Sequence, residues 1–309
     1  MYIHVVAPGE SAWSIARAYG VSERLLSEIN GLGSVPTLSV GQALLILTPE
    51  VTHTVKSGET LSAIAAEYGV TVQNLLQNNP SLSLASNLYP GQTVVISYTD
   101  EKLRDIRLNG YAYTYIEPWI LKKALPYLSS LTIFGYGITE TGNLIEIDDE
   151  PLIVLAEAYS SAPVMLLSSV TENGTFSGER ASMLFRNETV QRRAIADIVE
   201  TMKEKGYVGL DVDFEYIPPE DAEYYFQFLR NVTSALHEEG FRVNVDLAPK
   251  TFAGQPGLLY ESHNYEVIGS IADTVLIMTY EWGYTYGPPL VKNSALNFPF
   301  SAEFSCQIL

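Results

Sequence analysis

The sequence predicts an α/β fold, in which two small β-α-α-β modules precede a larger domain of parallel strands covered by helices. Two observations predict this architecture. The first third of the chain contains an internal repeat at an offset of 49 residues, and the remainder alternates apolar, β-rich segments with helical ones. A polar segment at 99–102 separates the two parts.

The repeat is clearest where each copy begins. Residues 4–11 read HVVAPGES, and residues 53–60 read HTVKSGET. The tripeptide Tyr-Gly-Val recurs at 19–21 and 68–70, at the same offset. Matches that keep their order and their spacing indicate two copies of one structural unit.

Each copy has the pattern of a β-α-α-β unit. In the second copy an alternating strand at 53–55 enters a turn, and Thr60 is placed to cap a helix that stops at Gly69. A second amphipathic stretch at 72–76 and a closing strand at 93–96 complete the unit.

Both copies resemble LysM modules, through the H-x-V-x-x-G-E-S/T opening, the Y-G-V helix end and the G-Q-x-L/V-x-I close. The resemblance covers 2–47 and 52–97, and it sets module boundaries at 1–48 and 51–98. It implies binding of N-acetylglucosamine polymers such as peptidoglycan or chitin. The ligand in that family lies between two loops, which here contain Gly9, Glu10, Ser11, Asn30, Gly58, Glu59, Thr60 and Asn79. The alternative is that these residues only form turns and helix caps.

The larger domain contains six apolar segments typical of strands, at 108–113, 131–136, 164–170, 208–214, 242–247 and 275–280. One helical stretch between them runs over 182–205 and stops at Gly206. Another begins at Pro218 and stops at Gly240. Alternating strands and helices predict a parallel sheet with helices outside, either an open doubly wound sheet or a barrel.

The segment 209–216, GLDVDFEY, carries the candidate chemistry. Side chains alternate along a strand, so Asp211, Asp213 and Glu215 share one face and apolar residues share the other. Three carboxylates at steps of roughly 6–7 Å repel one another, so we expect at least one raised pKa and a general acid that keeps its proton near neutral pH. Two alternatives are a solvated acidic face on an edge strand and a Mg²⁺ or Ca²⁺ site of three carboxylates.

The same segment resembles glycoside hydrolase family 18, whose fourth barrel strand carries D-x-x-D-x-D-x-E. Val208 departs from it, at the first Asp. The run 278–289, MTYEWGYTYGPP, resembles the family's M-x-Y-D motif, with Glu281 where Asp is usual. It especially resembles the spore cortex-lytic N-acetylglucosaminidases, in which two LysM modules precede the catalytic domain. The resemblance implies that 103–309 forms an incomplete (β/α)8 TIM-type barrel of about six strands.

The resemblance also implies substrate-assisted, retaining hydrolysis of an N-acetylglucosamine-containing glycan, with no metal and no cofactor. Glu215 would protonate the glycosidic oxygen and later activate water, while the substrate's own acetamido oxygen attacks the anomeric carbon. Asp213 would hold the acetamido N–H and share a proton with Asp211, and Tyr280 would donate to the acetamido oxygen. Substrate contacts are expected from Tyr111, Glu281, Trp282 and Tyr284. For the aromatic residues among these, and for Tyr280, the alternative is packing in the core of the domain.

The strand spacing leaves too little chain for a closed barrel. Successive strands begin about 33 residues apart, and 27 residues follow Trp282, so we expect the last two of eight strands to be missing. This expectation keeps two alternatives open. One is a peptidoglycan- or chitin-binding protein without catalysis, and the other is a chain without function.

Composition excludes other classes of protein. Lys+Arg total 18 against 36 Asp+Glu, and the formal charge of −18 argues against nucleic acid and membrane surfaces as partners. Cys306 is the one cysteine, which excludes an intrachain disulfide and a multi-cysteine metal site. No apolar run reaches the ~18 residues of a membrane span, and the N-terminus lacks a signal-peptide pattern.

The resemblance to spore cortex-lytic enzymes implies a location in the spore coat, the cortex or the cell wall, with the cytoplasm as the alternative. The oligomeric state stays open.

Overall fold

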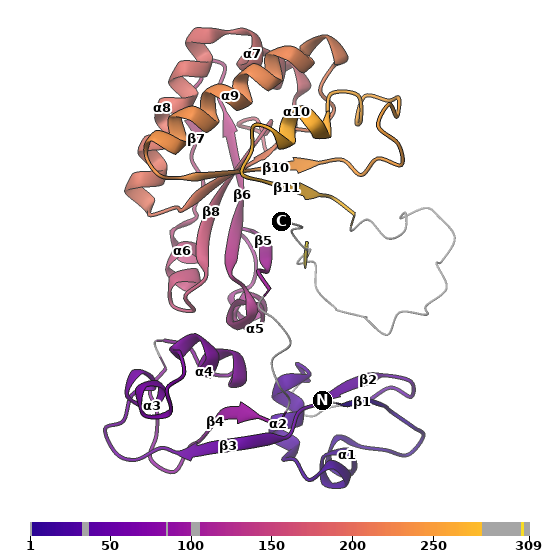
Figure 1. Ribbon diagram of the computed structural model, residues 1–309, viewed down its shortest axis with the longest axis vertical. Coiled ribbons are helices and arrows are strands. Elements are labelled where there is room, and N and C mark those ends of the chain that lie inside the picture. The colour runs from indigo at the N-terminus through magenta and orange to yellow at the C-terminus, as the bar shows by residue number, and fades with distance from the viewer. Residues whose placement is uncertain (1, 33–36, 85, 100–105, 280–303, 306–309) are drawn as a thin grey trace.

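The computed structural model describes residues 2–32, 37–84, 86–99, 106–279 and 304–305. Two small N-terminal modules lie at one end of the molecule, and a larger α/β domain lies at the other (Figure 1). Four predicted site residues lie outside the described residues: Tyr280, Glu281, Trp282 and Tyr284.

The first module is a β-α-α-β unit whose two strands pair antiparallel. Its elements are β1 (Tyr2–Val5), α1 (Ala12–Tyr19), α2 (Glu23–Ile29) and β2 (Ala43–Ile46). Ser11 caps α1 by accepting a hydrogen bond from the N–H of Ser14, and Gly20 ends the helix in the left-handed region at φ 69°. A small apolar core that includes Ile15 and Leu26 holds the module together.

The second module repeats this design. Its elements are β3 (Pro49–Thr54), α3 (Leu61–Tyr68), α4 (Val72–Asn78) and β4 (Thr93–Tyr98), and β3 pairs antiparallel with β4. Thr60 caps α3 through the N–H of Ala63, and Gly69 ends α3 at φ 66°. The predicted β-α-α-β pattern is therefore confirmed, with its own core around Ile64 and Leu75.

Six parallel strands form the sheet of the α/β domain, and they lie in the order in which they occur along the chain. They are β5 (Asn109–Tyr113), β6 (Ser130–Ile138), β8 (Ala162–Ser168), β9 (Gly209–Asp213), β10 (Arg242–Leu247) and β11 (Thr274–Ile277). Two short strands pair antiparallel with them, β7 (Leu144–Ile145) with β6 and β12 (Phe304–Ser305) with β5. The prediction of about six parallel strands is confirmed, and the sequential order is that of a barrel rather than of a doubly wound sheet.

Helices cover the outer face of this sheet (Figure 1). They are α5 (Pro118–Ala124), α6 (Glu150–Glu157), α7 (Gly178–Arg186), α8 (Glu188–Lys205), α9 (Ala222–Glu238) and α10 (Tyr265–Gly269), with 3₁₀ turns η1 (Leu125–Tyr127) and η2 (Pro219–Asp221). None of the helices in the described part of the chain is long and apolar enough to cross a membrane.

The helix predicted over 182–205 is wrong in one respect, because two helices occupy this segment. Asn187 has the extended backbone angles φ −105° and ψ 102° between α7 and α8. Its side chain accepts hydrogen bonds from the N–H groups of Thr189 and Val190, which makes it the N-cap of α8. The predicted end at Gly206 is confirmed by its φ of 79°.

The outward face of β9 packs against aromatic side chains of the helices. The ring of Phe214 lies 5.1 Å from that of Phe185 on α7 and 6.0 Å from that of Phe228 on α9. This apolar layer is the face opposite to the predicted acid row, as strand alternation requires.

The sheet curls so that side chains of distant strands meet on its inner face. Tyr111 lies on β5 and Asp211 on β9, and two strands, β6 and β8, separate them in the sheet. The Tyr111 hydroxyl nevertheless lies 2.6 Å from a carboxylate oxygen of Asp211. A flat sheet with strands about 4.8 Å apart would keep them well beyond contact, so the inner face is concave, as in a barrel.

The second module contacts the α/β domain at the amino ends of its strands. Gln73 Nε2 donates to the carbonyl oxygen of Pro126 at 3.0 Å. The N–H of Leu84 donates to the carbonyl oxygen of Ala158, also at 3.0 Å. Pro126 lies just before β6 and Ala158 just before β8. The contact is therefore on the N-terminal edge of the sheet.

A buried carboxylate at the start of α6 ties three elements together. Asp149 is 1% exposed and accepts hydrogen bonds from the hydroxyls of Tyr136 and Tyr207 and, at 2.7 Å, from Lys205 Nζ. Burial opposes ionisation of Asp149, but these hydrogen bonds outweigh it and lower its pKa. Asp149 is therefore a buried, fully paired anion.

Candidate active site

The acid row lies on β9, which has β8 on one side and β10 on the other. Asp211 and Asp213 occupy alternate positions of β9, and Glu215 lies two residues beyond its end. Asp211 is 1% exposed, whereas Asp213 and Glu215 are partly buried. The three carboxyl groups run from the interior toward the C-terminal edge of the sheet. The alternative of a solvated face on an edge strand is wrong, because β9 is a central strand.

Donors from three other strands hold Asp211. Tyr111 Oη and Asn244 Nδ2 each donate to it at 2.6 Å, and Thr132 Oγ1 lies 3.5 Å away. Burial raises the pKa of Asp211, while these hydrogen bonds act in the opposite direction. The expectation that at least one acid of the row has a raised pKa is confirmed at Asp211.

Tyr111, predicted as a substrate contact, is part of this buried network. Its hydroxyl also lies 3.2 Å from Oδ1 of Asp246. Burial and the neighbouring carboxylates raise the pKa of Tyr111, so its hydroxyl keeps its proton and acts as a donor. The hydroxyl is committed to the acids, and contact between the Tyr111 ring and a substrate stays a prediction.

Two polar residues of β10 belong to the site although the sequence analysis did not single them out. Asn244 lies opposite Asp211 in the register of β9 and β10, and Asp246 lies two residues further along the same face. Asp246 is 3% exposed, and Asn244 Nδ2 lies 3.1 Å from its Oδ1. The alternation of polar and apolar residues in RVNVDL was the signal for an inward-facing pair.

The backbone that carries Glu215 is held from outside the strand by His263. The N–H of Ala248 donates to His263 Nδ1 at 2.8 Å, so Nε2 bears the ring proton and donates to the carbonyl oxygen of Phe214 at 3.0 Å. Burial lowers the pKa of His263, which keeps the ring neutral. The role of this histidine is therefore structural.

Ser262 holds the other side of the same segment. Its hydroxyl donates to the carbonyl oxygen of Ile217 at 2.9 Å. Between these two contacts the chain turns at Tyr216, which has a positive φ of 53° that few residues with a Cβ adopt. The turn directly follows Glu215, and two neighbouring side chains of one loop fix it.

Comparisons with known proteins agree with this geometry. The model of the glycosyl hydrolases family 18 matches residues 158–306, and the LysM domain model matches 4–46 and 53–97. The chain is 34% identical over 294 residues to the cortical fragment-lytic enzyme of Bacillus subtilis (strain 168), covering 77% of this chain and 67% of the relative. The chain belongs to glycoside hydrolase family 18.

Solved structures of other proteins show the same fold. The crystal structure of the Bacillus cereus spore cortex-lytic enzyme SleL matches with a TM-score of 0.69 and 32% identity, over 94% of this chain and 67% of that one. A chitinase from Chromobacterium violaceum matches with a TM-score of 0.54 and 20% identity, over 58% and 57% of the two chains, and shares the fold. The chain thus spans about two thirds of the length of SleL.

The departure from the family 18 motif at Val208 lies outside the acid network. Val208 precedes β9, is 48% exposed and is three residues from Asp211. Its N–H donates to the carbonyl oxygen of Pro163, at the start of β8. The described hydrogen bonds of Asp211 come from other strands and do not involve this position.

Aromatic side chains from the carboxyl end of β5, from β6 and from the loop between β8 and α7 form a continuous group. Tyr113 stacks on Tyr115 with ring centroids 5.1 Å apart, Phe134 lies 4.5 Å from Tyr113, and Phe176 lies 6.3 Å from Phe134. Tyr115 is 79% exposed and Phe176 is 63% exposed. Exposed aromatic faces of this kind suit the apolar faces of sugar rings.

The residues predicted to bind glycan in the LysM modules all take part in the fold of their own module. Asn79 Nδ2 donates to the carbonyl oxygens of Leu75 and Val95, and its Oδ1 accepts from the N–H of Val95. Asn30 makes the equivalent three bonds in the first module. Both amide hydrogens of each side chain are used within the module, so a glycan contact there would need the second lone pair of Oδ1 or the neighbouring backbone.

The loop after the first strand is built alike in both modules. Gly9 and Gly58 have φ of 85° and 82°, and Ser11 and Thr60 are helix caps. The predicted alternative of turn and cap thus describes their structural role, and glycan contact by these residues stays a prediction.

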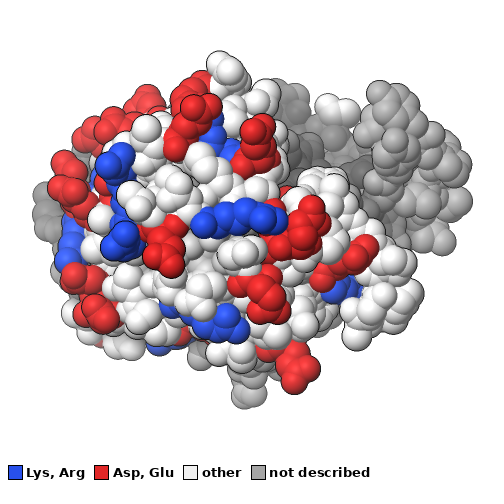
Figure 2. Space-filling model, turned by 90° about the horizontal axis from the view of Figure 1, so that it is seen from above, with Lys and Arg blue, Asp and Glu red and all other residues white. Residues whose placement is uncertain are grey.

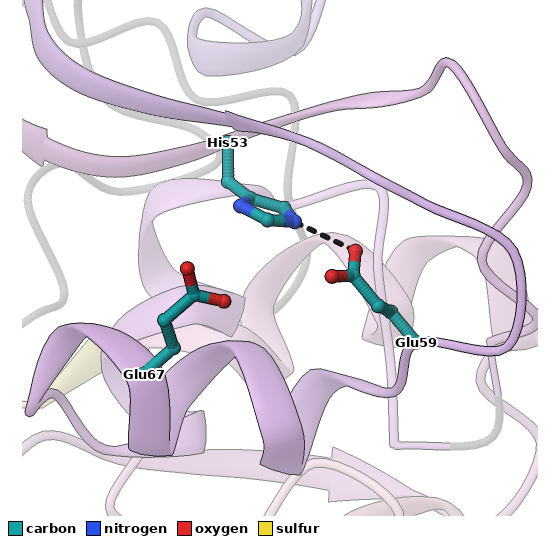
Figure 3. Close-up of side chains that lie close together, drawn as sticks. All are labelled: His53, Glu59 and Glu67. Atoms are coloured by element: carbon teal, nitrogen blue, oxygen red, sulfur yellow. Dashed lines mark hydrogen bonds and ion pairs between the residues drawn. The ribbon is translucent and has the colours of Figure 1, made fainter.

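Glu59 closes this loop in the second module (Figure 3). Its Oε2 accepts from the N–H of Lys56 at 2.7 Å and lies 2.7 Å from His53 Nε2, while His53 Nδ1 lies 3.2 Å from the hydroxyl of Tyr68. The first module has the same arrangement of Glu10, Ala7, His4 and Tyr19. Its recurrence indicates a structural clamp.

Glu67 adds a second carboxylate beside this clamp in the second module. Ligand atoms of His53, Glu59 and Glu67 lie within 4.8 Å of one another. Both ring nitrogens of His53 already have partners, and the first module has Ala18 at the position of Glu67. The group is therefore an extension of the clamp, and a metal ion would have to displace the hydrogen bond between His53 and Glu59.

Proposed function

We propose that this chain hydrolyses N-acetylglucosamine-containing glycans of the spore cortex or cell wall, with the LysM modules anchoring it to the polymer. The observation that carries the proposal is the acid row on β9, with Asp211 buried and hydrogen-bonded and Glu215 at the C-terminal edge of the sheet. The relatives named as cortical fragment-lytic and spore cortex-lytic enzymes support this class of substrate. Chitin-like polymers share the same sugar and are the second substrate to test.

In the proposed mechanism, Glu215 protonates the glycosidic oxygen as general acid. The acetamido oxygen of the substrate attacks the anomeric carbon, and the bond to the leaving group breaks as an oxazolinium ion forms. Asp213 accepts a hydrogen bond from the acetamido N–H and stabilises the charge that develops there. Glu215 then removes a proton from water, the water oxygen bonds to the anomeric carbon, and the bond from that carbon to the acetamido oxygen breaks. The oxazolinium ring opens, the acetamido group is restored, and the anomeric configuration of the substrate is retained. Tyr280 is assigned to the acetamido oxygen by the family motif alone.

The turn at Tyr216 supports the role of Glu215. A general acid must be held within hydrogen-bond reach of the leaving oxygen, and small displacements are costly to the rate. Contacts of His263 and Ser262 fix the backbone on both sides of Glu215. The fold therefore fixes the backbone from which the Glu215 side chain projects.

The test is the substitution Glu215→Gln in the full chain. It removes the proton donor and keeps the size of the side chain, so release of new reducing ends from peptidoglycan fragments should fall by about 10²–10⁴-fold. Glu220→Gln, on the exposed turn η2, is the matched control and should retain full activity. A wild-type chain that cleaves no N-acetylated glycan, or a Glu215→Gln variant as active as wild type, would contradict the proposal.

The alternative to hydrolysis is a protein that binds the wall without cleaving it. Pull-down on peptidoglycan by a wild-type chain that releases no reducing ends would assign the chain to binding alone. Retention of Glu215→Gln on the polymer, with turnover lost, is the result that the hydrolytic proposal expects.

A further inference from the structure

Asp246 adds a fourth carboxyl group to the acid network. It lies on β10, beside Asp211 on the neighbouring strand β9. The same two donors serve both acids. Tyr111 lies 2.6 Å from Asp211 and 3.2 Å from Asp246, and Asn244 lies 2.6 Å and 3.1 Å from them.

Two buried carboxyl groups that share two donors are too close for both to be ionised, because two anions in this position would repel each other without solvent to screen them. The donors of the network favour the charge on Asp211. The single hydroxyl proton of Tyr111 goes to the shorter contact, and Asn244 is also closer to Asp211 than to Asp246. Asp246 is thus the partner with the weaker donors.

The electrostatic surroundings agree with this assignment. Burial raises the pKa of Asp246 well above its ordinary value, and the charges of Asp211 and Asp213 raise it further. Four titratable groups of the described residues lie close to Asp246: Asp211 and Asp213 on β9, Tyr111 on β5 and Tyr225 on α9. None of these four is a cation, so nothing among them favours an ionised Asp246.

We propose that Asp246 is a positioning residue of the active site: a protonated carboxylic acid on β10 that donates a hydrogen bond to Asp211 and holds it as a carboxylate. The mechanism inferred from the sequence took the proton on this acid row as shared between Asp211 and Asp213. With Asp246 supplying that proton, Asp213 keeps its own carboxylate for the acetamido N–H of the substrate. Asp246 makes no bond to the sugar, and its proton stays in place through the reaction.

This role rests on the proposed function for its effect on turnover, but the location of the proton can be tested without turnover. The full chain is examined by infrared spectroscopy near neutral pH, where a protonated carboxylic acid has a carbonyl stretch apart from those of carboxylates. All proteins carry Glu215→Gln, so that the proposed general acid contributes no carboxylic acid band of its own. In this background the band should be present with Asp246 intact and in Asp148→Asn, a control at an exposed acid, and absent in Asp246→Asn. A band that persists in Asp246→Asn places the proton elsewhere and overturns the proposal.

The kinetic arm compares two variants. Asp246→Asn keeps a neutral donor to Asp211 and should turn over near neutral pH much as the wild type does. Asp246→Ala removes the donor and should lose about 10–100-fold, the worth of a hydrogen bond to a charged group. Above the pH at which Asp246 loses its proton, turnover of the wild type should fall further than that of Asp246→Asn, because no second anion can form beside Asp211 in the variant.

The outcomes separate the two proposals. Superimposable pH profiles, or an Asp246→Asn variant as impaired as Asp246→Ala while its circular dichroism matches wild type, would overturn the role of Asp246. A wild type that cleaves no glycan would contradict the proposed function, while the infrared result would still decide where the proton lies.

Discussion

Asp149 and Asp246 are both buried, yet their surroundings drive them to opposite protonation states. Asp149 faces Lys205 and two tyrosine hydroxyls, which lower its pKa. Asp246 faces two other carboxylates, and burial with their charges raises its pKa. The number of donors around each carboxyl group, rather than its depth, decides whether it is an anion.

Replacement of Asp149 should show this in stability. Its folded-state pKa is lowered, so its contribution is present above the unfolded pKa of about 3.9 and is lost as pH falls through the folded value. Asp149→Asn should therefore destabilise the protein by roughly 3 kcal/mol at neutral pH, as breaking a buried ion pair does. The deficit should shrink on acidification.

Urea unfolding at several pH values measures this effect. Asp148→Asn, one residue away and exposed, is the matched control and should follow the wild type at every pH. A deficit for Asp149→Asn that stays constant down to acidic pH would argue against an ionised Asp149.

The residue-level picture was predictable only where a single segment carried it. Strand alternation within 209–216 was enough to place Asp211 and Asp213 on the inner face and Phe214 on the outer one. Asp246 was missed because its significance depends on the register of β10 against β9, which brings Asn244 opposite Asp211. No pattern within one segment contains that register.

At the level of elements, the strands were easier to predict than the helices between them. The predicted strand at 242–247 coincides with β10, because polar and apolar residues alternate along it. The break at Asn187 was missed, because a single asparagine can occur inside a long helix. The sequence pattern alone does not distinguish that case from an asparagine that caps a new helix. The short helix α10 has only five residues, too few to show helical periodicity.

Gly137 marks the closest approach between β6 and a neighbouring loop. A Cβ at this position would lie 1.9 Å from the carbonyl oxygen of Val170, which is backbone and cannot move aside cheaply. Gly137→Ala should therefore destabilise the α/β domain by about 1–3 kcal/mol or more. Gly254→Ala, where nothing lies within 4 Å, should leave stability within about 0.5 kcal/mol of wild type.

Thermal melts of the two glycine variants provide the comparison. Equal melting temperatures for Gly137→Ala and Gly254→Ala would show that the loop at Val170 can move away from β6, and that the contact does not constrain the strand.

At the scale of the whole molecule, charge opposes any attraction to anionic wall polymers. The chain carries −18, and basic side chains are interspersed with acidic ones on the face in Figure 2. Affinity for peptidoglycan must then come from sugar contacts, so binding should hold or strengthen as salt rises from about 0.01 M to about 0.15 M and the Debye length falls from roughly 30 Å to 8 Å.

Sedimentation with insoluble peptidoglycan across this salt range measures the effect. A chain that lacks residues 1–98 is the control, and it should lose retention at every salt concentration if the LysM modules supply the contacts. Binding that collapses as salt rises would indicate an ionic mode of attachment instead.

The two contacts that fix the turn after Glu215 both come from the loop between β10 and α10, through Ser262 and His263. That loop therefore holds the backbone of the general acid in place, although it lies almost fifty residues further along the chain. Loops at this end of a barrel are the usual material for exchanging specificity between enzymes. If this loop were replaced by that of another enzyme, the two contacts that hold the backbone at Glu215 would be lost with it. A chimera would therefore have to retain Ser262 and His263 to keep its general acid aligned.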